Sequence, residues 1–135
     1  MHIVKADLPE SIDTLELHVF SDTHIGDPAC NLALIKQRVQ SVQDNPYAHC
    51  ILNGDIINNA TKTSVSDSYA EVLPPMEQIQ RGISIFNPIK DKILCMTTGN
   101  HERRTYKKEG IDLAEIMAAQ MGLQDKFRAE GILLF

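Results

Sequence analysis

The sequence contains no tryptophan, and aromatic residues make up only 5% of its 135 residues. No apolar run approaches the roughly 20 residues that a membrane-spanning helix needs, so we expect no membrane partner. The N-terminus has neither the apolar core of a secretory signal nor the Arg- and Ser-rich character of a transit peptide. These absences predict a cytoplasmic protein.

Cysteine and basic residues are also scarce. Cys30, Cys50 and Cys95 are odd in number and widely spaced, which fits neither a disulfide framework nor a thiolate metal site. We therefore expect all three cysteines to be reduced and to serve as packing residues. The 13 basic residues are outnumbered by 18 acidic ones, for a formal net charge of −5. This balance excludes broad electrostatic binding to nucleic acid or anionic membranes, but it allows a local basic site.

The remaining composition, 43% hydrophobic and 23% charged residues, is ordinary for one domain spanning residues 1–135. Short apolar runs predict strands at 15–20, 48–52, 92–96 and 131–135. Helical spacing of apolar residues predicts helices at 28–44, 71–86 and 111–121, the first with Asp27 as its N-cap. The composition of residues 58–68 predicts a surface loop. This alternation predicts an α/β layered fold, whose ligand sites gather at the carboxyl ends of the strands.

Polar residues that can bind metal follow three of these predicted strands: Asp22 with His24, then Asp55, then Asn100 with His101. Carboxylate, imidazole and amide ligands without thiolate suit ions such as Mn²⁺, Fe²⁺ or Zn²⁺. A carboxylate such as Asp55 can bridge two ions. Two ions roughly 3.5–4 Å apart would grip a phosphate oxygen and activate a bound water. His101 would then assist as an acid or by stabilising charge.

Three strings in this order, Asp22-Thr23-His24, Gly54-Asp55 and Gly99-Asn100-His101-Glu102, resemble the motifs of the calcineurin-like metallophosphoesterase superfamily. The resemblance implies a pair of sheets sandwiched between helices and two divalent ions, Mn, Fe or Zn. It also implies that Asp22 and His24 bind the first ion, Asp55 bridges both, Asn100 binds the second and His101 assists catalysis. The implied activity is metal-dependent hydrolysis of phosphate esters by a phosphodiesterase, nuclease or phosphatase, with nucleic acid among the candidate substrates.

The sequence departs from this family on its C-terminal side. The family completes its metal sites with a further histidine and a Gly-His-x-His string, yet no histidine follows His101. The second ion would keep only Asp55 and Asn100, so we expect one ion to bind better than two, weak or absent activity, and an incomplete domain. The alternative is a non-catalytic domain that acts only through folding or association. An apolar strand at the C-terminal end also predicts a homo-oligomer through its edge.

Each candidate residue also has a plainer interpretation. Taken singly, each of the residues Asp22, His24 and Asp55 fits a turn or cap position. Their occurrence together in this order favours their interpretation as metal ligands. Asn58 and Arg103 are the candidate substrate contacts. For Asn58 the alternative is an ordinary loop residue, and for the basic run 103–108 it is a solvated surface turn. Gly54-Asp55 lacks the Asp-Arg-Gly continuation of protein phosphatases, so the substrate stays open.

Overall fold

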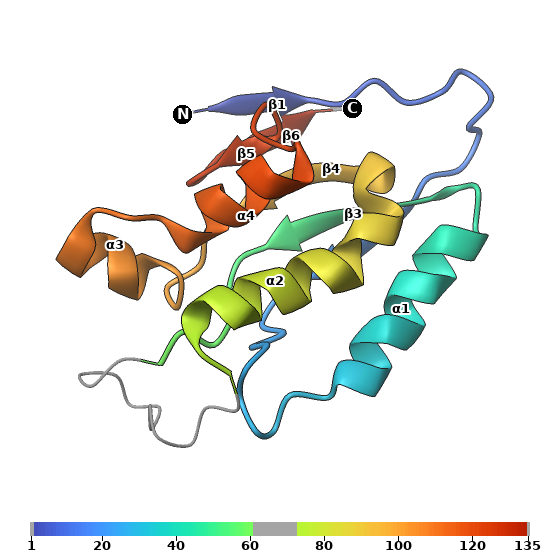
Figure 1. The fold of residues 1–135 in the computed structure, drawn as a ribbon. Coiled ribbons are helices and arrows are strands. Elements are labelled where there is room, and N and C mark those ends of the chain that lie inside the picture. The colour runs from blue at the N-terminus through green and yellow to red at the C-terminus, as the bar shows by residue number, and fades with distance from the viewer. Residues whose placement is uncertain (1, 61–72, 135) are drawn as a thin grey trace.

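The computed structural model describes residues 2–60 and 73–134 (Figure 1). The elements along the chain are β1 (Ile3–Lys5), β2 (Glu16–Phe20), α1 (Leu32–Asp44), β3 (Ala48–Asn53), α2 (Pro75–Phe86), the 3₁₀ helix η1 (Asn87–Lys92), β4 (Ile93–Thr97), α3 (Arg103–Glu109), α4 (Leu113–Met121), β5 (Phe127–Arg128) and β6 (Ile132–Leu134). Within these two segments, no helix has the length and apolarity to span a membrane.

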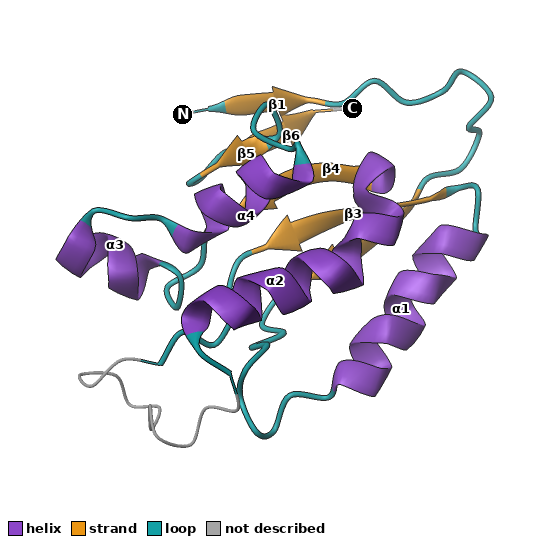
Figure 2. Cartoon of the chain, viewed as in Figure 1, coloured by secondary structure: helices purple, strands orange, loops and turns teal. Residues whose placement is uncertain are grey.

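The strands form two parallel sheets. The larger has the order β2-β3-β4-β5, and the smaller pairs β1 with β6. Helices α1, α2 and α4 run along one face of the larger sheet, as Figure 2 shows. The predicted α/β class with helices flanking a sheet is therefore confirmed. Because neighbouring strands are parallel, their carboxyl ends emerge together at one edge of the sheet.

The hydrophobic core lies between the larger sheet and its helices. Leu52 and Met96 from the central strands and Phe86 at the end of α2 are fully buried. The rings of Phe20 and Phe86 pack edge to face with centroids 5.1 Å apart. On the other face of β2, Val19 is 56% exposed. Apolar residues along β3 and β4 thus anchor the strand ends that carry the candidate ligands.

Helix α1 begins later than the sequence predicted. Its N-cap is Asn31, whose side chain accepts a hydrogen bond from the Leu34 N–H at 3.0 Å. Asp27 caps a preceding turn instead, accepting from the Ala29 N–H at 2.7 Å. Both residues can cap, but only Asn31 directly precedes the helical run. The prediction that Asp27 and Pro28 start this helix is wrong.

The segment after β3 also differs from the prediction. Asn58 and Asn59 are 2% and 1% exposed, so the predicted surface loop is wrong at its first residues, while residues 61–68 lie outside the described part. Helix α2 begins at Pro75, after the extended Pro74. The predicted helical residues 71 and 72 also fall outside the described segments.

Four short elements were not predicted: β1, η1, α3 and β5. The basic run that begins at Arg103 lies at the surface, as its interpretation as a solvated surface turn requires, but it forms helix α3 rather than a turn. Strand β6 was predicted, but β1 pairs with it along one edge, with Val4 opposite Leu133. That partner lies at the other end of the sequence, which no local pattern could indicate.

Candidate metal centre

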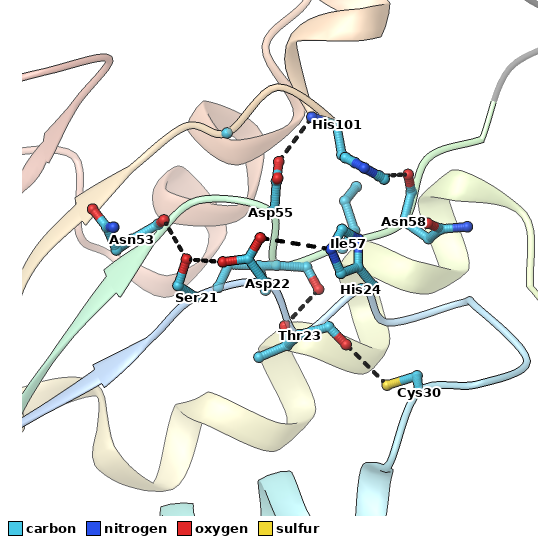
Figure 3. Close-up of polar contacts among 12 residues, drawn as sticks. Ser21, Asp22, Thr23, His24, Cys30, Asn53, Asp55, Ile57, Asn58 and His101 are labelled. Atoms are coloured by element: carbon cyan, nitrogen blue, oxygen red, sulfur yellow. Dashed lines mark hydrogen bonds and ion pairs between the residues drawn. The ribbon is translucent and has the colours of Figure 1, made fainter. Parts of the chain in front are cut away.

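The carboxyl ends of β2, β3 and β4 bring three of the candidate residues together (Figure 3). One ligand atom each from His24, Asp55 and His101 lies within 4.8 Å of the other two. The rings of His24 and His101 meet edge to face, with centroids 4.3 Å apart. An imidazole–carboxylate–imidazole group of this size can surround one cation.

The backbone at this site is strained. Asp22, His24, Asp55 and Asn59 have φ of 54°, 46°, 50° and 43°, and they are the non-glycine residues with positive φ in the described part of the chain. Side chains disfavour this left-handed region, at a cost of about 1–3 kcal/mol each. Three of the four are predicted metal ligands. In proteins, residues of this kind cluster at active sites and ligand-binding sites, because only the surrounding fold keeps the strain in place.

Asp55 is fixed from two sides. Its backbone N–H donates to the Glu102 carboxylate at 3.0 Å, and its Oδ1 accepts from the His101 backbone N–H at 2.8 Å. Gly99 packs so closely that a Cβ there would stand 2.2 Å from the Asp55 nitrogen and Oδ1. The loops after β3 and β4 therefore require glycine at this contact, and they present the Asp55 carboxylate in one orientation.

Glu102 supports both loops from beneath. It is only 1% exposed, and its carboxylate accepts from the backbone N–H groups of Asp55 at 3.0 Å, Ile57 at 3.0 Å and Gly99 at 2.9 Å. These charge-assisted bonds compensate the burial of the carboxylate. In the sequence, Glu102 is visible only as the acidic residue that ends the Gly-Asn-His-Glu string. Its hydrogen bonds to the two loops were not predicted.

Asp22 lies at the rim of the cluster. Its Oδ1 is 3.8 Å from His24 Nε2, and its side chain is 67% exposed. The Ser21 hydroxyl donates to the other Asp22 oxygen and also contacts the Asn53 carbonyl at 3.2 Å. The neighbouring His24 N–H donates to the Asp55 carbonyl at 3.1 Å. Asp22 can therefore reach an ion bound beside His24.

A cavity of about 370 Å³ opens beside the cluster. Its lining includes Asp22, His24, Asn58 and His101. Two other predicted site residues are placed differently: Asn100 is exposed in the turn before α3, Arg103 is exposed on α3, and neither lines the cavity. The structure thus gathers Asp22, His24, Asp55, Asn58 and His101, whereas Asn100 and Arg103 are exposed and are not among the residues that line the cavity.

No protein-family model, curated protein or solved structure matches this chain.

Cys30 also lines the cavity, but as a thiol. Burial, reinforced by the nearby Asp27 carboxylate, raises the pKa of Cys30, and its Sγ donates to the Thr23 carbonyl at 3.1 Å. A neutral thiol is a poor metal ligand. All three cysteines are free, as predicted. The donor set at the cluster is therefore nitrogen and oxygen, which suits Mn²⁺, Fe²⁺ or Zn²⁺.

Proposed function

We propose that the chain binds a divalent metal ion at His24 and Asp55, with Asp22 as the third ligand, and hydrolyses phosphate esters. The observations that carry this proposal are the convergence of His24 and Asp55 beside His101 within 4.8 Å, and the position of Asp22 Oδ1 3.8 Å from His24 Nε2, on backbone that is strained at all three proposed ligands. When bound, an ion at such a site supplies a Lewis acid and an activated water. The motif order shared with calcineurin-like metallophosphoesterases further supports this reaction class.

The residues around the proposed ion have different roles. Asp55 presents a carboxylate held by Glu102 and His101, so little reorganisation is needed on binding. His101 lines the cavity and holds a proton on the ring nitrogen that faces the Asn58 carbonyl at 2.6 Å. We assign His101 to the substrate, where it stabilises phosphoryl charge or protonates the leaving group. Asn58 is the neighbouring substrate contact.

The ligand count favours one ion over two. The second ion of the resembled family would depend here on only two protein ligands, Asp55 and Asn100, because no histidine follows His101. Weak hydrolysis follows, because one ion clamps a phosphate less firmly than two. The same shortage of ligands favours the alternative, a metal-binding domain without turnover. Phosphodiesters, including nucleic acid, and phosphomonoesters are both candidate substrates.

Calorimetric titration with Mn²⁺ tests the metal site. The chain should bind one ion tightly, and Asp55→Asn should weaken binding by about tenfold or more, because it removes the central carboxylate. Asp91→Asn, the same chemical change at an exposed position of η1, should leave binding unchanged. Two equal tight sites would contradict the proposal that one ion binds better than two. The absence of any binding would refute the proposed metal site.

Hydrolysis of bis(p-nitrophenyl) phosphate and p-nitrophenyl phosphate tests the reaction. We expect slow, Mn²⁺-dependent turnover that Asp55→Asn abolishes. His101→Ala should slow turnover more than it weakens Mn²⁺ binding, because His101 is assigned to the substrate. Metal binding without turnover of either ester would support the non-catalytic alternative.

A further inference from the structure

Both ring nitrogens of His101 are engaged by protein groups. Nδ1 lies 2.6 Å from the Asn58 carbonyl oxygen (Figure 3), and Nε2 lies 3.0 Å from a guanidinium nitrogen of Arg104. A carbonyl oxygen can only accept a hydrogen bond, and a guanidinium can only donate one. The proton of the neutral ring therefore sits on Nδ1, and the Nε2 lone pair points at Arg104.

Arg104 is itself held in place. Its Nη1 donates to the backbone carbonyls of Asn58 at 3.1 Å and Asn59 at 3.4 Å. The side chain is half-buried, whereas that of Arg103, its neighbour on α3, is exposed. A guanidinium group is a planar cation that offers forked hydrogen-bond donors. Arg104 therefore presents a fixed cation to the histidine.

This contact bears on how an ion would be coordinated. His101 is close enough to join His24 and Asp55 around a cation. A metal ion, however, needs an imidazole lone pair, and the only one on His101 already accepts from Arg104. One lone pair serves one cation at a time, so an ion could take Nε2 only by displacing the guanidinium.

We propose that Arg104 is a positioning residue that fixes His101 as its Nδ1–H tautomer and keeps Nε2 out of the metal's coordination. The part concerning the metal rests on the proposed function. The ion is then held by His24 and Asp55, and His101 stays a non-ligand imidazole in the cavity lining. Arg104 thus keeps His101 apart from the residues that hold the ion, and the guanidinium must leave Nε2 before that nitrogen can carry a proton to the substrate.

Histidine ¹⁵N NMR of the metal-free chain tests the tautomer. At pH 8 the wild-type His101 ring should show a protonated Nδ1 and an unprotonated Nε2. Arg104→Ala should let the Nε2–H form appear, and Arg104→Lys should restore the wild-type pattern, because an ammonium also only donates. Arg103→Ala removes the same charge from the same helix and should change nothing. A wild-type Nε2–H ring, or an unaltered pattern in Arg104→Ala, would overturn the proposal.

A double-mutant cycle with Mn²⁺ tests the coordination. His101→Ala should change wild-type affinity little, whereas Arg104→Ala should strengthen binding by about tenfold as Nε2 becomes a ligand. Adding His101→Ala to Arg104→Ala should remove that gain. A large loss from His101→Ala alone, or no gain from Arg104→Ala, refutes the exclusion of His101. If no variant binds Mn²⁺, the proposed function and the coordination step both fail, while the NMR result still decides the tautomer.

Discussion

Glu102 shows how one buried charge orders a site that it does not enter. Its three backbone hydrogen bonds join the loop after β3 to the loop after β4. Two of the donors belong to Asp55 and Gly99, which are in close contact. The position of the Asp55 carboxylate therefore depends on a side chain beneath it, and the site is sensitive to changes at Glu102.

Replacing Glu102 with glutamine should weaken Mn²⁺ binding by about tenfold or more, since second-layer partners of ligands have effects of this size. The amide NH₂ of glutamine would face a backbone donor, so at least one buried N–H would lose its acceptor. Glu109→Gln, an equivalent change at the exposed end of α3, is the control. Calorimetry gives the affinities. Equal affinity in Glu102→Gln and the wild type would show that the brace is not needed for the site.

Among the elements, helix α4 is tied directly to the site. Asp112 is its N-cap and accepts from the Ala114 and Glu115 N–H groups at 2.9 and 3.4 Å. The same oxygen accepts from the hydroxyl of Thr98, which directly precedes Gly99, at 3.1 Å. One carboxylate therefore starts the helix and attaches it to the loop after β4.

Asp112→Ala should lower the free energy of unfolding by about 1 kcal/mol, the usual loss for an N-cap. Asp112→Asn keeps a capping oxygen, and asparagine caps as well as aspartate. We therefore expect it to stay close to the wild type. Urea denaturation monitored by circular dichroism measures both. An equally large loss in the two variants would assign the effect to the charge rather than to the cap.

The predictability of the elements follows their length and apolar content. Strands β2, β3 and β4 could be predicted because each is marked by a run of apolar residues. Helix α4 could be predicted because its apolar residues recur at helical spacing, although its N-cap at Asp112 was not recognised. Helix α3 has no apolar spacing, and its only strong signal is Gly110, which ends it with φ of 70°. Strands β1 and β5 are three and two residues long, too short for a periodic pattern.

The candidate site was predictable to the level of residue type and order. Asp22, His24 and Asp55 follow predicted strands, and parallel strands bring such ends together. The roles of Glu102 and Arg104 could not be predicted, because most of their hydrogen-bond partners lie more than 40 residues earlier in the sequence. Which of two adjacent arginines turns inward depends on the register of a helix that the sequence did not reveal.

For the molecule as a whole, the ionisation of the Cys50 thiol makes the free energy of unfolding depend on pH. Cys50 is fully buried in the central strand β3, and burial raises its pKa from 9.0 to about 12. The folded state therefore keeps the thiol proton at pH values where the unfolded state releases it. Stability from this proton is complete below pH 9 and is lost as the pH rises toward 12. We expect the free energy of unfolding to fall across this alkaline range.

Thiol labelling tests whether Cys50 becomes accessible only when the whole molecule unfolds. In a Cys30→Ala, Cys95→Ala variant, Cys50 should react with a thiol reagent at pH 8 only as fast as the whole molecule unfolds. A wild-type comparison should label Cys30 first, because its side chain is only partly buried. Fast labelling of Cys50 without denaturant would show that β3 opens locally. Association of two chains stays a prediction, and sedimentation can measure it on the same samples.

The pairing of β1 with β6 sets a condition on the order of folding. Ile3 lies opposite Ile132, so their contact closes a loop that contains nearly the whole described chain. Closing long loops is slow, and distant pairings tend to form after local ones. During synthesis on the ribosome, β1 has no partner until the residues of β6 have emerged. By then all residues of the larger sheet have been synthesised, so the metal cluster can assemble before β1 pairs with β6.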